Sequence, residues 1–254
     1  MARPTIRELL DSKGKKKYTQ VNVSNADFAE ACELAGIDML GVSALNLPAV
    51  RAAAPNTFII AAAPRPSYKP SDADAIRACY EVMSNGADAV YMCPGLDRMK
   101  AVSKMNIPVF GHVGFVPDHL TWIGRHRAVG KTADEALKVY RDVLAHQEAG
   151  AIGVEMEVVP HKIAAEICRR VDIFVISLGS GSDLDGEYLF ACDILGSHNK
   201  HYPRHSKTYR NFFDESVDAF KEWKEEVDSG AFPEPGNIVE IKDEEFEKFM
   251  NEMG

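Results

Sequence analysis

Short apolar runs alternate along this chain with longer segments whose apolar residues recur at helical spacing. Each run is rich in Val, Ile and Ala and ends near Gly, Pro, Ser or Asn, which is typical of buried strands. Regular alternation of strand and helix predicts an α/β protein with a parallel sheet, and eight repeats favour a (β/α)₈ TIM barrel. The predicted strands are 18–23, 37–44, 57–64, 87–93, 107–115, 152–158, 173–178 and, as the eighth, 188–194.

The segments between these runs carry helix start and stop signals. Ser24-Asn25 precede one predicted helix, and Thr132 with Glu135 three residues later has the spacing of a capping box. The segment 5–13 predicts a short amphipathic helix that covers the floor of the barrel. We therefore expect one domain over residues 1–254, with an acidic, helical C-terminal tail. The other predicted helices are 27–36, 47–54, 71–86, 161–170 and 214–227.

Composition narrows the class of protein. A chain of 254 residues that is 46% hydrophobic and 26% charged can bury one substantial core. Its net charge of −9 argues against nucleic acid or an acidic membrane as a partner. Five cysteines without a CxxC pair predict no disulfide framework and no structural zinc site. With neither a signal peptide nor a long apolar segment, we expect a cytoplasmic protein.

The candidate chemistry lies where predicted strands end. The strand 152–158 contains Glu155 and Glu157, which point the same way by strand alternation, so that their charges can raise each other's pKa. His112 ends the preceding strand and can bind a ligand or orient Glu157. The turn Gly179-Ser180-Gly181 is a weak phosphate signal because it lacks the spacing of a dinucleotide or P-loop motif.

Other candidates are open to two interpretations. Cys93 can be a nucleophile or a soft metal ligand, but the favoured interpretation is a small apolar filler. Arg65 and Arg125 follow strands three and five, and a guanidinium there could bind a carboxylate without a metal, although arginines are common on surfaces. We interpret Asp185 mainly as a side chain that structures its loop.

A set of motifs in register along nearly the whole chain resembles the ketopantoate hydroxymethyltransferase family. They are TIRELLDSKGKKK, AGIDML, GHVGFVP at 111–117, GKT at 130–132, EVVP at 157–160, GSG with DGEYLFACDILG, PRHSKTY and VDSGAFP. The resemblance implies a TIM barrel of the phosphoenolpyruvate mutase and isocitrate lyase type. It also implies transfer of a one-carbon unit from methylenetetrahydrofolate to a 2-oxo acid, and a large homo-oligomer.

The resemblance assigns roles to individual residues. The general base of the family falls on Glu157, and its histidine falls on His112. A lysine that accompanies the 2-oxo acid is replaced by Tyr91, and a segment that normally follows strand two is missing after Asn46. The family holds Mg²⁺ with three carboxylates, whose positions here carry Ser43, Ala62 and Cys93.

Mg²⁺ requires oxygen ligands, which this set of side chains does not provide. We therefore predict an aldol-type enzyme that makes or breaks a C–C bond next to the carbonyl of a small 2-oxo acid, without Mg²⁺ at the ancestral site. Tetrahydrofolate is a candidate one-carbon donor and no other cofactor is predicted. The alternative is an inactive paralogue that serves as a binding or scaffold protein. Glu157 and His112 are the predicted catalytic residues, and the predicted substrate-binding residues are Ser43, Arg65, Tyr91, Cys93 and Arg125.

Overall fold

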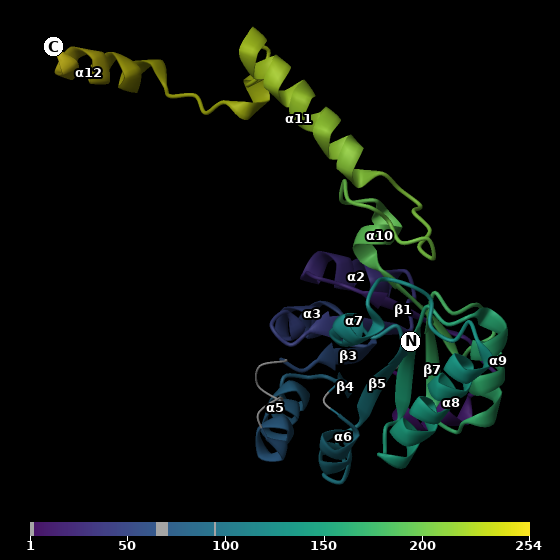
Figure 1. The fold of residues 1–254 in the computed structure, drawn as a ribbon. Coiled ribbons are helices and arrows are strands. Elements are labelled where there is room, and N and C mark those ends of the chain that lie inside the picture. Colours follow the sequence, from purple (N-terminus) through teal and green to yellow (C-terminus); the bar gives the residue numbers. More distant parts are fainter. Residues whose placement is uncertain (1–2, 65–70, 94) are drawn as a thin grey trace. The chain divides into compact units, whose positions relative to one another are not determined.

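The computed structural model describes residues 3–64, 71–93 and 95–254. Eight parallel strands form a closed barrel in the order of the sequence, with helices packed around it (Figure 1). The predicted (β/α)₈ fold is therefore confirmed. The strands are β1 Tyr18–Asn22, β2 Met39–Ser43, β3 Phe58–Ala62, β4 Ala89–Tyr91, β5 Val109–Gly114, β6 Gly153–Glu157, β7 Phe174–Leu178 and β8 Gly186–Phe190.

Most predicted helices are present with ends within a few residues of those expected. The side chain of Thr132 accepts a hydrogen bond from the backbone N–H of Glu135 and begins α8. The helix α6 was not predicted, because it is short and begins at Gly95 without a side-chain cap. The helices of the barrel are α1 Ile6–Asp11, α2 Ala26–Leu34, α3 Leu47–Ala53, α5 Asp72–Ser84, α6 Leu96–Ser103, α7 Leu120–Ile123, α8 Ala133–Glu148 and α9 His161–Arg170.

The prediction for the eighth strand was wrong in its bounds. The strand β8 begins at Gly186, where it pairs with Tyr18 of β1, and ends at Phe190. Residues Ala191–Leu195 form the helix α10 instead of continuing the strand. A Cβ atom at position 186 would lie 2.9 Å from the carbonyl oxygen of Tyr18, so glycine is needed for this close pairing.

The lower part of the barrel interior is filled with apolar side chains. Phe58, Phe110 and Phe174 are buried there, and Leu9 of α1 is buried in the same cluster. Partly buried Ile6 and Leu10 pack against this cluster as well, so that α1 covers the floor as predicted. Hydrophobic burial of this kind is the main contribution to stability and leaves the upper end of the barrel for polar groups.

Residues beyond the barrel form a second compact unit, which comprises Leu195–Lys200 and Tyr209–Gly254. It contains the helices α11 Phe212–Ser229 and α12 Asp243–Met253. Neither helix has a buried residue, and Phe220, Trp223 and Phe249 are exposed. The prediction of a single domain therefore stays a prediction. Among the described residues, no helix combines the length and hydropathy needed to cross a membrane.

Candidate active site

Strand alternation places two glutamates and a histidine on the inner face of the barrel. Val154 and Met156 of β6 pack outward in an apolar cluster, so Glu155 and Glu157 point inward; that the two share one face was predicted. The neighbouring strand β5 contributes His112, which is the register partner of Glu155. The side chains of these three residues therefore meet near the carboxyl ends of their strands, where barrel enzymes carry their active sites.

The imidazole of His112 is buried between the two carboxylates. Its Nε2 lies 3.0 Å from Oε2 of Glu157, an ion pair that lacks the alignment of a hydrogen bond, and its Nδ1 lies 4.0 Å from Oε2 of Glu155. Burial by itself would lower the pKa of His112, but the Cys93 and Glu157 side chains and the charge of Glu155 raise it to about 10. His112 is therefore an imidazolium at neutral pH.

Glu155 is the more deeply buried carboxylate, with 6% of its surface exposed. Burial raises its pKa to about 7 and the charge of Glu157 adds to this, while His112 and a hydrogen bond from Gln20 act in the opposite direction. A neighbouring carboxylate thus contributes to the rise, as predicted, although burial is the larger cause. Near neutral pH, Glu155 exists in both protonated and ionised forms.

Tyr91 joins this group from β4. Its hydroxyl lies 2.7 Å from Nδ1 of His112, and the thiol of Cys93 donates to the same hydroxyl oxygen over 3.4 Å. Burial raises the pKa of Tyr91 well above its usual value, so the side chain remains a phenol. Because an imidazolium donates from both nitrogens, the tyrosine oxygen accepts from His112, which leaves the tyrosine hydrogen free to donate to another group.

The backbone next to Glu157 is strained. Val158 has a φ of 50°, which is unusual for a β-branched residue and costs on the order of 1–3 kcal/mol. Two hydrogen bonds hold it there, from the N–H of Val158 to the carbonyl of Leu178 and from the N–H of Val129 to the carbonyl of Val158. This turn fixes Glu157 at the end of its strand.

Gly114 completes the same corner. A Cβ atom at this position would lie 2.4 Å from the carbonyl oxygen of Glu157, and its φ is 84°. Only glycine therefore allows β5 to end beside Glu157. The glycine two residues after His112 in the GHVG motif thus has a structural reason that the sequence motif by itself does not reveal.

A second polar group inside the barrel was missed by sequence reasoning. Asn22 donates to the hydroxyl of buried Tyr188 over 3.0 Å, and Gln20 is 2% exposed beside them. A Cβ atom at Gly41 would lie 3.1 to 3.3 Å from polar atoms of all three side chains. The available signal was Gln20 and Asn22 at alternate positions of a strand whose remaining core is apolar.

The structure does not bring every predicted residue into this group. Ser43 ends β2 and is exposed, and Arg125 is exposed in the segment after α7, where it forms no ion pair with any described residue. Its neighbour Arg127 instead pairs with Glu135 over 2.9 Å. Arg65 lies outside the described residues. Among the described residues, therefore, no arginine pairs with the two glutamates.

The positions that resemble the metal ligands of the family do lie on adjacent strands. Ser43 is the register partner of Ala62, which in turn pairs with Tyr91, and Cys93 lies two residues further on. A hydroxyl, a methyl group and a thiol do not suit a hard cation such as Mg²⁺, which prefers carboxylate oxygens and water. The residues present at these positions therefore do not fit this ion.

Two further sequence features have structural roles. The hydroxyl of buried Ser180 accepts from the N–H of Val159 and donates to the carbonyl of Met156, so the Gly179-Ser180-Gly181 turn ties two strands together. Asp185 accepts hydrogen bonds from Lys13 over 2.6 Å and from the N–H of Val175 over 2.8 Å. This agrees with its interpretation as a side chain that structures its loop.

Sequence comparisons match this chain to one family over most of its length. A sequence model of the family described as ketopantoate hydroxymethyltransferase matches residues 43–235. A protein of Kosmotoga olearia named 3-methyl-2-oxobutanoate hydroxymethyltransferase is 34% identical, over 92% of this chain and 97% of its own length. A protein of the same name from Staphylothermus marinus is 32% identical, over 98% of this chain and 100% of its own length.

Solved structures support the fold independently. A 2,3-dimethylmalate lyase, described as a member of the PEP mutase/isocitrate lyase superfamily, has a TM-score of 0.58 at 13% identity, covering 99% of this chain and 100% of its own. A phosphonopyruvate hydrolase has a TM-score of 0.56 at 11% identity, covering 98% of this chain and 97% of its own. At these identities, the likeness concerns the barrel fold alone. Through its sequence, the chain belongs to the ketopantoate hydroxymethyltransferase family of enzymes.

Proposed function

We propose that this protein transfers a hydroxymethyl group to a small 2-oxo acid by an aldol-type reaction, without Mg²⁺ at the ancestral position. Membership of the family supports the reaction class. The observation that carries the metal-free form is the buried imidazole ring of His112, which lies between Glu155 and Glu157 and contacts Tyr91. A fixed positive charge at this place can stabilise a developing oxyanion without a metal ion.

Glu157 is proposed as the general base. It removes the proton from the carbon next to the keto group, and the electron pair of the broken C–H bond forms the enolate. Water releases the one-carbon unit from the donor as formaldehyde, and the donor nitrogens take up the two hydrogens of the water. The enolate carbon attacks this carbonyl carbon to form the new C–C bond, and the resulting alkoxide takes back the proton held by Glu157 to give the hydroxymethyl group. Glu157 suits this task because it ends β6 and is less buried than Glu155, so that it faces the end of the barrel where a substrate enters.

His112 and Tyr91 are proposed to hold the charge of the enolate. The free hydroxyl hydrogen of Tyr91 donates to the enolate oxygen, and the imidazolium behind it strengthens this donor. Preorganised donors of this kind each contribute about 3 kcal/mol to transition-state stabilisation. Tyr91 thus supplies, together with His112, the electrostatic role that a divalent cation plays in metal-dependent enolate chemistry.

The remaining sequence-based predictions are included in this proposal as predictions. Ser43, Cys93, Arg65 and Arg125 stay predicted substrate-binding residues, and tetrahydrofolate stays a candidate donor. A cytoplasmic location and a homo-oligomeric state are likewise predictions. The alternative, an inactive scaffold protein, predicts that no enolate forms. An assay of enolate formation therefore separates the enzyme from the scaffold.

Enolate formation can be measured without any donor. In D₂O with EDTA, 3-methyl-2-oxobutanoate should exchange its hydrogen at C3, as followed by proton NMR. We expect Glu157→Gln to slow this exchange by about 100-fold or more, whereas Glu81→Gln, which removes an exposed carboxylate on α5, should have no effect.

Two outcomes would contradict the proposal. If the native protein catalyses no exchange either with EDTA or with added Mg²⁺, the scaffold alternative is favoured. If the exchange requires Mg²⁺, the metal-free mechanism is wrong. An unchanged rate in Glu157→Gln would remove this residue from the reaction, provided that the circular dichroism spectrum of the variant matches that of the native protein.

A further inference from the structure

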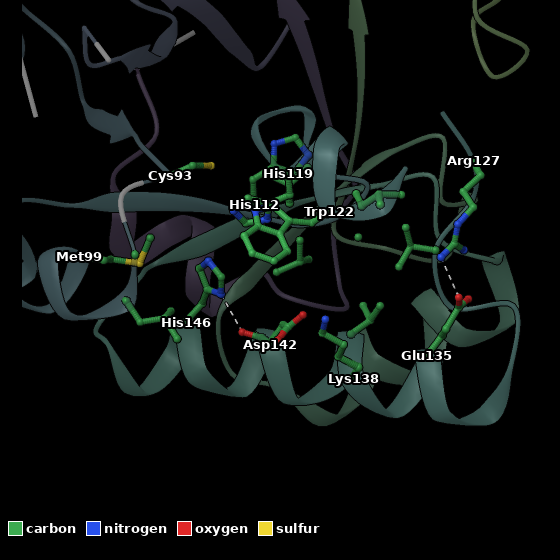
Figure 2. A pocket seen from close by; sticks show the side chains of 18 residues that line it. Cys93, Met99, His112, His119, Trp122, Arg127, Glu135, Lys138, Asp142 and His146 are labelled. Carbon is green, nitrogen blue, oxygen red and sulfur yellow. Dashed lines mark hydrogen bonds and ion pairs between the residues drawn. The ribbon is translucent and has the colours of Figure 1, made fainter. Parts of the chain in front are cut away.

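The thiol of Cys93 lies just beyond the carboxyl end of β4, beside the candidate active site. Sequence reasoning favoured a small apolar filler at this position, but the side chain is half-buried and lines a cavity of about 600 Å³ on the flank of the barrel (Figure 2). The helices α6, α7 and α8 surround this cavity, and His112 lines it as well. A small molecule in the cavity therefore reaches the thiol.

The short pairing of β4 with β5 explains this access. These strands share only two register pairs, whereas β5 and β6 share five. The last hydrogen bond of the β4–β5 ladder among the described residues runs from the N–H of Met92 to the carbonyl of Phe110. Cys93 and His112 lie beyond this bond, so the barrel wall is interrupted next to the candidate site.

A hydroxyl group connects Cys93 to the candidate active site. The thiol of Cys93 donates to the hydroxyl oxygen of Tyr91 over 3.4 Å, and Nδ1 of His112 lies 2.7 Å from the same oxygen. A hydroxyl oxygen has two lone pairs, so it accepts from both neighbours at once. The hydrogen of the Tyr91 hydroxyl is therefore available to an oxygen atom of a bound molecule.

A buried nitrogen at the same place lacks a hydrogen-bond partner. His112 is only 6% exposed, and its Nε2 makes no hydrogen bond to any described residue, although a carboxylate oxygen of Glu157 lies 3.0 Å away. Buried polar groups are normally hydrogen-bonded, so each exception requires an explanation. This nitrogen and the available hydrogen of Tyr91 together indicate that a small ligand with an oxygen atom belongs next to Cys93.

Other thiols of the chain have different surroundings. Cys79 is buried and donates to the sulfur of Met92, and Cys32 packs against the apolar core. Burial raises the pKa of Cys32 to about 11 and that of Cys79 to about 12, so both remain protonated and unreactive at neutral pH. Cys93 differs from them because its thiol meets both a hydroxyl group and a cavity.

From this arrangement, we infer that Cys93 captures the released one-carbon unit, formaldehyde, as a covalent hemithioacetal. The sulfur attacks the carbonyl carbon and forms an S–C bond, and the π electron pair of the carbonyl moves to its oxygen. This oxygen takes the hydroxyl hydrogen of Tyr91, while the thiol hydrogen passes to the Tyr91 oxygen. Cys93 then carries S–CH₂–OH, and Tyr91 is again a phenol. Because formaldehyde is released only if the transfer reaction occurs, this inference rests on the proposed function.

The capture is reversible and holds the aldehyde until the acceptor is ready. In the reverse step, the electron pair of the S–C bond returns to sulfur, the thiol regains its hydrogen through Tyr91, and formaldehyde is released. Tyr91 then donates its own hydrogen to the enolate oxygen, as proposed above. Cys93 thus keeps a small aldehyde that would otherwise diffuse away close to the enolate carbon, which raises its effective concentration there.

Capture can be measured without the donor or the 2-oxo acid. Formaldehyde labelled with ¹³C, added to the native protein, should give a saturable NMR signal of a carbon bonded to both sulfur and oxygen, separate from the signal of hydrated formaldehyde. Cys93→Ser should lose this signal. Cys32→Ser is the matched control, because it removes a thiol that is also half-buried but packs against the apolar core, and it should keep the signal.

The proton path through Tyr91 has a test of its own. In Tyr91→Phe, the thiol hydrogen has no hydroxyl through which to reach the carbonyl oxygen. The rate at which the ¹³C signal forms should therefore fall by about 100-fold. A rate equal to that of the native protein would overturn the role of Tyr91 in the capture.

The native protein provides a second measurement that depends on no variant. Iodoacetamide alkylates accessible thiols, and mass spectrometry of peptides reports the rate of alkylation at Cys93. Formaldehyde at about ten times its dissociation constant should slow this rate about tenfold, because the captured thiol is blocked by mass action. Equal alkylation of Cys93 with and without formaldehyde would overturn the inference, as would a ¹³C signal that is absent from the native protein or persists in Cys93→Ser.

Failure of the proposed function remains distinguishable from failure of this inference. The exchange of the C3 hydrogen needs no formaldehyde and reports only on the acceptor chemistry. If the native protein catalyses this exchange but formaldehyde does not add to Cys93, the inference is wrong and the proposed function stands. If the adduct forms at Cys93 while the native protein catalyses no exchange, Cys93 is an aldehyde-binding thiol and the proposed transfer reaction is wrong.

Discussion

Replacement of Glu155 by Gln should change how the stability of the barrel depends on pH. In the folded protein, burial raises the pKa of this carboxyl from 4.5 to about 7. The folded state therefore holds its proton more tightly than the unfolded state does. As pH rises from about 4.5 through 7, the native protein loses stability at this site, and the loss is complete above both values.

The size of the loss follows from the same two values. A pKa that moves from 4.5 to about 7 corresponds to about 3 kcal/mol, which includes the favourable charge of His112 and the hydrogen bond from Gln20. Glutamine has nearly the same shape, can accept the bond from Gln20 and does not titrate. The stability of the variant relative to the native protein should therefore rise by about 2 to 3 kcal/mol between pH 5 and pH 8.

Urea denaturation followed by near-ultraviolet circular dichroism, at several pH values between 5 and 8, provides the measurement. The quantity of interest is the difference in unfolding free energy between variant and native protein, because titration of all other groups largely cancels in it. Glu81→Gln serves as the exposed control, with a difference that stays flat. A flat difference for Glu155→Gln would refute the interpretation that this carboxyl is buried beside an imidazolium.

Three further predictions concern other parts of the molecule. Tyr91→Phe should slow the C3 exchange by about tenfold to 100-fold, because it removes the hydroxyl that contacts His112. The unfolding free energy should stay nearly unchanged. An unchanged exchange rate would exclude the Tyr91 hydroxyl as a donor to the enolate. Asp185→Asn should lower the unfolding free energy by about 3 kcal/mol or more, because it leaves the ammonium of Lys13 without its buried partner. Urea denaturation measures this free energy, and a loss below about 1 kcal/mol would contradict the prediction. Turnover should be unaffected by EDTA, and restoration of activity by added Mg²⁺ would refute the metal-free site.

The sequence predicted the barrel and the facing of its polar residues because both depend on local pattern. A period of two residues along β6 is enough to place Glu155 and Glu157 on one face, and apolar runs bounded by turn residues are enough to mark the strands. The eighth strand was misplaced because its start is set by pairing with Tyr18, at a residue far away in the sequence. The helix α6 was missed because it is short and lacks a side-chain cap.

Only the tertiary structure decided how the inward-facing residues meet. Register between strands brings His112 beside Glu155 and Tyr91 within hydrogen-bond distance of His112, and no local pattern encodes this register. The raised pKa of Glu155 and the interruption between β4 and β5 likewise arise from long-range packing. The sequence by itself therefore determined which side chains share a face of their strand, because side-chain direction alternates along the chain. The structure determined their distances and charges, because these depend on closure of the whole sheet.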